Sequence, residues 1–161
     1  MGEQNSAAKP KRRYKSFTYH TGLNWVENRA AMLSSEEKPT FRVASPPEFK
    51  GEAGVWTPED LFVAAVDSCT FTTFMAFALH RKLPLVSYES RAEGLLEFAE
   101  GQYQFTRVEL RPKIQVAFPE AIETAREILE DAHKGCLVAN SIKTKVVIVP
   151  EIEAVESQQE G

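Results

Sequence analysis

Two cysteines are the residues of this chain whose chemistry points most directly to catalysis. Cys69 lies in a long apolar segment, LFVAAVDSCTFTTFMAFAL, and Cys136 lies 67 positions later in HKGCLVANS. Two thiols form a redox couple when the fold brings their Cα atoms within about 7 Å. Two buried cysteines can equally be inert packing residues. Composition alone leaves both interpretations open.

A reactive cysteine needs a lowered pKa. A free thiol has a pKa of about 8.5, so only a few per cent of it is thiolate at pH 7, and the thiolate is the nucleophile. Making thiolate the major form requires a shift of about two units, or about 2.7 kcal/mol. Cys69 lies well inside its predicted helix, so the positive helix end is too distant to supply this. We therefore expect a cation beside Cys69.

A long helix over residues 58–81 must position Cys69. Thr57 suits the N-cap, Pro58 suits the first helical position, and Glu59 and Asp60 favour the positive helix end. Pro84 ends the helix. The segment is apolar nearly all round, so one sheet can cover only one side of it, and a second copy of the chain is the simplest cover for the other.

The remaining elements are mostly strands. Residues 14–43 predict two or three strands, and residues 45–54 predict a loop. Strands are expected at 85–98 and 103–117, joined by an AEGQ turn, with Pro112 indicating an edge or a bulge. A second helix is expected over 119–134 and a last strand over 143–152. Strands outnumber helices and pair mostly as hairpins, which predicts an α+β fold.

Length and composition indicate one soluble domain. The chain has 161 residues, 43% of them hydrophobic and 26% charged, which predicts a domain over residues 14–152 between a disordered tail at 1–13 and an acidic tail at 153–161. The net charge of −4 gives no reason to expect nucleic acid. The polar N-terminus lacks a signal peptide, so a cytoplasmic location is expected.

Two further kinds of site are disfavoured by the sequence. Asp67 and several hydroxyl residues interrupt the apolar stretch from Leu61 to Leu79, so it is interpreted as a core helix and not as a membrane span. Two isolated cysteines with distant histidines lack the paired spacing of zinc ligands, so no metal site is expected.

Whole motifs in this chain resemble the OsmC/Ohr family of thiol-dependent peroxidases. TPEDLFVAAVDSCTFTTFMAFALHRKLPL and GCLVANSIK carry the resemblance, together with the hairpin sequence GQYQFTRV. The family has a cysteine ten residues after the first glutamate of a Pro-Glu-Glu-Leu-like helix start, and here Glu59 and Cys69 have that spacing. Its second cysteine begins a Cys-Pro-Val-Ser-Asn-Ser-like turn, and here Cys136 begins CLVANS. The resemblance covers roughly residues 16–152.

The resemblance implies a fold and a set of site residues. The fold would be OsmC-like, with antiparallel sheets around a long buried apolar helix in an intertwined homodimer. An arginine held by the glutamate that Glu59 matches would activate Cys69. Arg29 is the favoured candidate and Arg42 the alternative. Ten residues of straight helix span about 15 Å, so Glu59 would act through a bridging arginine, a bent helix or the partner subunit.

The resemblance also implies a reaction. Cys69 would attack an organic hydroperoxide, releasing an alcohol and leaving a sulfenic acid, and Cys136 would then form a disulfide with Cys69. A dithiol reductant, lipoyl-type in relatives, would restore the thiols without any bound cofactor. An apolar wall of Phe62, Val66, Phe71 and Phe74 would favour alkyl peroxides. The alternative is an OsmC-like thiol protein that binds apolar small molecules without significant peroxidase activity.

Overall fold

The computed structural model describes residues 14–155, so the predicted tail at 1–13 and most of the one at 153–161 lie outside the described residues. The fold is α+β, as predicted. Two short 3-10 turns, η1 (Pro47–Phe49) and η2 (Ala139–Ser141), accompany the helices and strands. In chain order the helices and strands are β1 (Gly22–Glu27), β2 (Ala30–Ser34), β3 (Phe41–Ala44), α1 (Pro58–His80), β4 (Leu85–Ala99), β5 (Gln102–Val116), α2 (Ala121–Gly135), β6 (Lys145–Ile148) and β7 (Glu151–Ala154).

A capping box fixes the start of α1, the helix that carries Cys69. The Thr57 hydroxyl accepts a hydrogen bond from the Asp60 backbone N–H at 3.1 Å, and the Asp60 carboxylate accepts one from the Thr57 N–H at 3.0 Å. Both bonds satisfy N–H groups that a helix end would otherwise leave unpaired. The predicted N-terminus is confirmed, and Asp60 is the acidic residue that caps it.

A long hairpin forms the main sheet. Strands β4 and β5 pair antiparallel, and Glu100 and Gly101 adopt positive φ at the turn between them. The expectation of a single last strand is wrong, because β6 and β7 are separate strands, and both pair parallel to β5.

Pro112 explains why the last segment of the sheet is divided into β6 and β7. Strand β5 is central and not at an edge, since β4 pairs with one side of it and β6 and β7 with the other. The Leu110 carbonyl accepts a bond from Val149 on the β6–β7 side, and backbone groups alternate along a strand, so Pro112 faces the same side. Its missing N–H falls between the last β6 pair, at Leu110, and the first β7 pair, at Lys113. The proline is accommodated by a gap in its neighbour.

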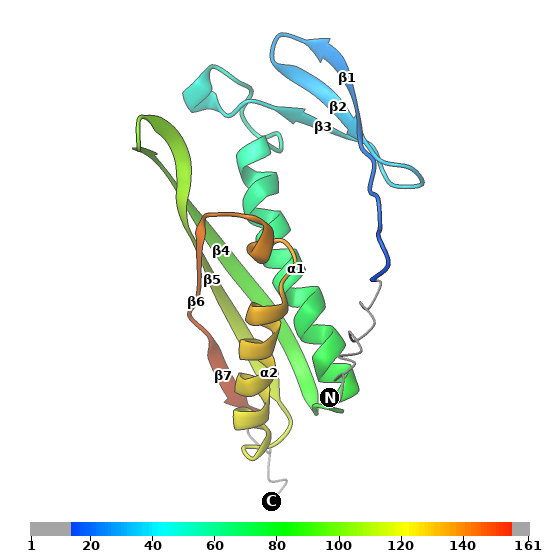
Figure 1. Cartoon of the computed structure of the whole chain (residues 1–161), viewed down its shortest axis with the longest axis vertical. Coiled ribbons are helices and arrows are strands. Elements are labelled where there is room, and N and C mark those ends of the chain that lie inside the picture. Colours follow the sequence, from blue (N-terminus) through cyan, green and yellow to red (C-terminus); the bar gives the residue numbers. More distant parts are fainter. Residues whose placement is uncertain (1–13, 156–161) are drawn as a thin grey trace, which may run out of the picture.

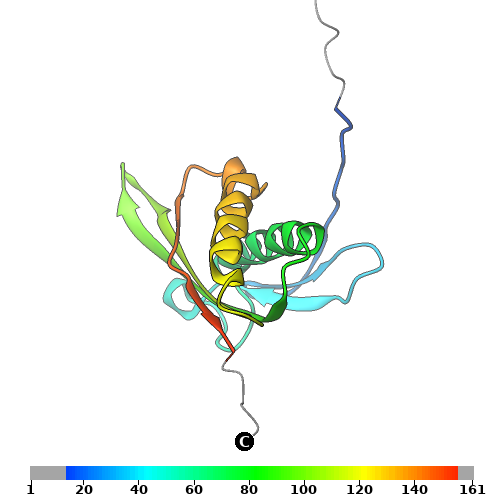
Figure 2. The same ribbon diagram turned by 90° about the horizontal axis from the view of Figure 1, so that it is seen from below.

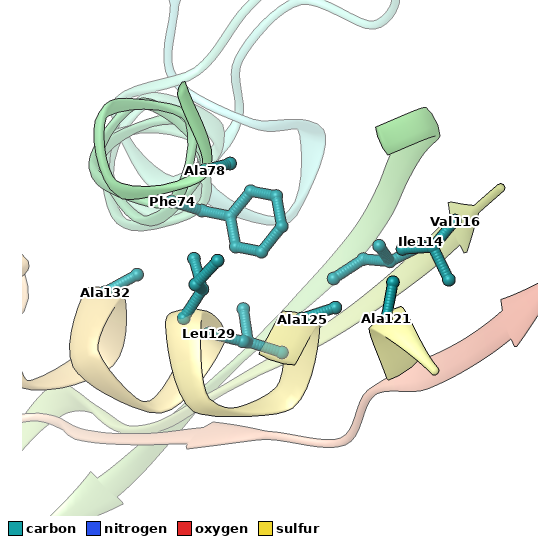
Figure 3. Close-up of a cluster of buried hydrophobic side chains, with 9 residues drawn as sticks. Phe74, Ala78, Ile114, Val116, Ala121, Ala125, Leu129 and Ala132 are labelled. Carbon is teal, nitrogen blue, oxygen red and sulfur yellow. The ribbon is translucent and has the colours of Figure 1, made fainter. Parts of the chain in front are cut away.

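The core lies between the helices and one face of this sheet (Figure 2). Phe74 and Ala78 of α1 point toward Leu129 and Ala125 of α2, with Ile114 of β5 beside them (Figure 3). A second buried cluster of Val66, Val108 and Leu110 lies on the same sheet. Together these contacts hold α1 and α2 side by side.

One side of the described chain exposes apolar surface. The sheet β1–β2–β3 lies beyond the N-terminal end of α1, and residues 14–21 extend from it as an arm (Figure 1). By length and composition α1 is apolar enough to cross a membrane, yet its sheet-facing side belongs to the core, so it is the core helix of the domain. Only 22% of the residues in the most apolar stretch of α1 are buried within a single chain. The arm and β1 expose several large side chains: Tyr14, Phe17, Tyr19, Leu23 and Trp25.

Candidate functional site

The turn that follows α2 presents Cys136. The residue has extended backbone angles (φ −66°, ψ 111°) and its carbonyl accepts a bond from the Asn140 N–H at 3.0 Å. The Asn140 side chain donates to the Lys134 carbonyl at 3.0 Å, and the Ser141 hydroxyl donates to the Leu137 carbonyl at 2.7 Å. Side-chain to backbone bonds therefore hold this turn, as the Asn and Ser residues of CLVANS suggest.

The two cysteines meet where α1 passes this turn. Cys69 and Cys136 are neighbours, since the Cys136 side chain lowers the pKa of Cys69 and the Cys69 side chain raises the pKa of Cys136. Cys69 is half-buried, Cys136 is fully buried, and both are free thiols. The fold thus places side by side two sulfurs that are far apart in the sequence.

Burial raises the pKa of the Cys69 thiol, but hydrogen bonds more than offset this and the pKa is lowered overall. The main offsetting donors are the backbone N–H of Val138, the Cys136 thiol and the backbone N–H of Leu137. Backbone N–H groups gathered in a turn form a concavity that favours a negative charge. No cation is among the groups that set this pKa within residues 14–155.

The surroundings of Cys136 have the opposite effect. Burial raises the pKa of the Cys136 thiol, and the Ala139 backbone N–H and the Thr70 hydroxyl offset this only in part. The neighbouring Cys69 raises it further. Because the two environments push the pKa values apart, Cys69 is the more acidic thiol and Cys136 stays protonated beside it. This asymmetry suits a nucleophile and a resolving partner.

Sequence reasoning missed three contributors to this site: two backbone N–H groups and one threonine hydroxyl. The backbone N–H groups of Leu137 and Val138 leave no side-chain signature, so no motif pointed to them. Thr70 follows Cys69 directly and is fully buried, and its hydroxyl lies 3.6 Å from the Cys136 sulfur. Its only signal is a hydroxyl group on a mainly apolar helix, and Ser68, Thr72 and Thr73 give the same signal.

Glu59 lies at the start of α1, in a groove of about 1150 Å³ between that helix end, the loop before it and the β4–β5 hairpin. The capping box uses Asp60, so Glu59 is not needed there. The Glu59 carboxylate oxygen Oε2 is shielded from solvent and has no hydrogen-bond partner among the described residues. Ten helical residues, about 15 Å, separate it from Cys69 along α1.

The two candidate arginines lie apart from the cysteines within one chain. Arg29 donates to the Phe49 carbonyl, and Arg42 forms ion pairs with Glu27 at 3.0 Å and Glu52 at 2.7 Å. Both line a polar cavity of about 410 Å³ beside the N-terminal sheet. Their role toward Cys69 stays a prediction.

The four residues of the predicted apolar wall divide into two pairs. Val66 and Phe74 are fully buried in the two core clusters and have no free surface. Phe62 stacks on Phe105 with ring centroids 4.6 Å apart. Phe71 is 38% exposed, and its ring centroid lies 5.0 Å from that of Tyr88. Phe62 and Phe71 thus keep some exposed surface, and the wall as a whole stays a prediction.

Comparison with known proteins agrees with this arrangement. Residues 51–151 match the family model described as OsmC-like protein. An OsmC-like protein of unknown function from Vibrio cholerae has a similar structure, with a TM-score of 0.77 and 22% identity over 84% of this chain and 99% of that one. An organic hydroperoxide resistance protein OsmC from Legionella pneumophila superposes with a TM-score of 0.67 and 21% identity, over 88% and 98% of the two chains. The uncharacterized protein YmaD of Bacillus subtilis is 19% identical over 80% of this chain and 88% of its own length.

Proposed function

Because the chain belongs to the OsmC-like family, we propose that it is a thiol-dependent peroxidase that reduces organic hydroperoxides to alcohols. The observation that carries the proposal is the contact between the half-buried Cys69, whose pKa is lowered, and the buried Cys136, whose pKa is raised. A related solved structure carries the name organic hydroperoxide resistance protein, and the same activity would follow from the chemistry of this pair.

The proposed reaction has three steps. The Cys69 thiolate attacks the terminal peroxide oxygen, so that an S–O bond forms, the O–O bond breaks, and the alkoxide takes a proton to leave as an alcohol. The Cys136 sulfur then attacks the Cys69 sulfenic acid and water leaves, giving the Cys69–Cys136 disulfide. A dithiol reductant, of the lipoyl type, returns both thiols by exchange.

The surroundings of Cys69 would favour peroxides with apolar groups. Phe62 and Phe71 would contact the alkyl chain, and the buried Val66 and Phe74 would support them from within the core. Each CH₂ removed from water contributes about 0.8 kcal/mol. An alkyl hydroperoxide would therefore bind more tightly than hydrogen peroxide, which has no apolar surface.

A homodimer would complete the site. Three features support it: the apolar side of α1 uncovered within one chain, the exposed aromatic residues of the N-terminal arm, and the unpartnered oxygen of Glu59. A second copy would cover the first two, and an arginine from the partner subunit, equivalent to Arg29 or alternatively Arg42, would pair with Glu59 and approach Cys69. We propose that this dimer acts in the cytoplasm, with neither membrane nor nucleic acid as a partner.

Steady-state consumption of tert-butyl hydroperoxide with dihydrolipoamide as reductant tests the proposed function. The wild type should turn over, Cys69→Ser should lose activity, and Cys136→Ser should stop after one turnover with this reductant. Hydrogen peroxide should be a poorer substrate. If the Cys69→Ser variant retained full activity, the proposal would be wrong. Binding of an apolar ligand that persists without both cysteines, in a protein that consumes no peroxide, would instead favour the binding protein.

A further inference from the structure

Thr70 is a fully buried residue of α1 with two acceptors for one proton. Its hydroxyl oxygen lies 3.0 Å from the Val66 carbonyl oxygen and 3.6 Å from the Cys136 sulfur. A threonine hydroxyl has a single hydrogen to donate, so it can satisfy only one of these at a time. While Cys136 is a neutral thiol, the carbonyl is the preferred acceptor, because a thiol sulfur accepts hydrogen bonds only weakly.

The preference should change when Cys136 loses its proton. Hydrogen bonds to a charged acceptor are roughly twice as strong as those between neutral groups. A Cys136 thiolate would be buried beside Cys69, and among residues 14–155 the donors that would stabilise it are the Ala139 backbone N–H and the Thr70 hydroxyl. The Val66 carbonyl, in contrast, already accepts the α-helical bond of its turn and loses little when the hydroxyl rotates away.

We propose that Thr70 is a positioning residue for the disulfide-forming step, donating a hydrogen bond from its hydroxyl to the Cys136 sulfur as that sulfur becomes a nucleophile. This proposal rests on the proposed function. In the step, the Cys136 sulfur forms the S–S bond, the S–O bond of the Cys69 sulfenic acid breaks, and the Cys136 proton leaves with the hydroxyl as water. Thr70 is not consumed, because its own proton stays on its oxygen throughout.

A neighbouring threonine provides a matched control. Thr72 lies on the same helix, is exposed, and donates its hydroxyl to the Cys69 carbonyl at 3.1 Å. Changing Thr72 to valine removes the same atom from the same helix without touching Cys136. Changing Thr70 to serine keeps the hydroxyl and removes only a methyl group.

The first test measures the titration of Cys136 by the ultraviolet absorbance of its thiolate in a Cys69→Ser background. Thr70→Val should raise the pKa of Cys136 by about one unit, a tenfold loss of thiolate at a given pH, because it removes a donor to the charged form. Thr70→Ser and Thr72→Val should titrate like the parent. A Thr70→Val protein that titrates like the parent, or a Thr70→Ser protein shifted equally, would overturn the proposal.

The second test follows the step itself in the full protein. After one equivalent of tert-butyl hydroperoxide, Thr70→Val should form the disulfide about tenfold more slowly and should accumulate sulfenic acid that dimedone traps, while Thr70→Ser behaves like the wild type. Disulfide formation in Thr70→Val at the wild-type rate would also overturn the proposal. If wild-type Cys69 is not oxidised at all, the proposed function fails, and the titration still decides whether Thr70 acts on Cys136.

Discussion

Replacing Leu137 with proline would remove a single backbone N–H group that lowers the pKa of the Cys69 thiol. Proline lacks this donor, and its ring suits the first position of a helical turn. The preceding residue, Cys136, already has the extended backbone that proline requires (φ −66°, ψ 111°). The Leu137 side chain is 75% exposed and contributes little packing. The motif that CLVANS resembles has a proline at this position, so the Leu137 N–H is a donor that this motif lacks.

The expected shift follows from the strength of the lost bond. A hydrogen bond to a charged group contributes about 1.5–3 kcal/mol, and one pKa unit corresponds to about 1.36 kcal/mol. Cys69 is only half-buried, so water replaces part of the lost stabilisation, and the Val138 N–H remains. We therefore expect Leu137→Pro to raise the pKa of Cys69 by about half to one unit.

The assay is the pH dependence of Cys69 alkylation, followed by mass spectrometry of the modified peptide. In the wild type the rate should persist below the pH at which an ordinary thiol loses reactivity, because thiolate remains down to the lowered pKa. The Leu137→Pro curve should move to higher pH. Leu137→Ala keeps the N–H and removes the side chain, so it should match the wild type. If the alanine and proline variants gave the same curve, the reasoning about the backbone donor would be refuted.

Two further predictions concern the framework around the site. A Cβ atom at Gly94 would lie 2.5 Å from the Val63 side chain and 2.9 Å from Phe105, so Gly94→Ala should destabilise the protein by about 1–3 kcal/mol in urea unfolding; an unchanged midpoint would contradict this packing. Burial and the Asp67 carboxylate raise the pKa of Tyr88 well above its ordinary value. Because the folded protein favours the protonated Tyr88 phenol, its contribution to stability is fully present below about pH 10, the pKa of tyrosine in the unfolded chain. The contribution is lost as the pH rises toward the higher pKa of Tyr88 in the folded protein. Tyr88→Phe should therefore lose less stability than the wild type on alkaline titration, and identical alkaline slopes would count against this account.

Local signals in the sequence were sufficient for much of the fold. The capping residues before α1 and the turn between β4 and β5 depend on neighbours in the chain, and both helices were predicted to within two residues at each end. The parallel pairing of β6 and β7 could not be predicted, because alternation of apolar residues does not distinguish parallel from antiparallel partners. The prediction that Pro112 marks an edge or a bulge was wrong, because the break that accommodates it lies between β6 and β7, which are distant from it in the sequence.

The candidate site was predictable in its residue types and not in its electrostatics. The cysteine motifs identified Cys69 and Cys136, and the fold brings these two together. The backbone N–H groups that lower the pKa of Cys69 belong to any amino acid, so only the shape of the turn discloses them. In the proposed dimer, the placement of an arginine would depend on a second copy of the chain, which a single sequence does not position.

Peptide mapping by mass spectrometry after one equivalent of an organic hydroperoxide tests the central claim most directly. We predict the loss of two hydrogen atoms and one cross-link within a single chain, between the peptide that carries Cys69 and the peptide that carries Cys136. A Cys69 carried to sulfinic acid while Cys136 stays a free thiol, or two thiols that survive the peroxide intact, would contradict it.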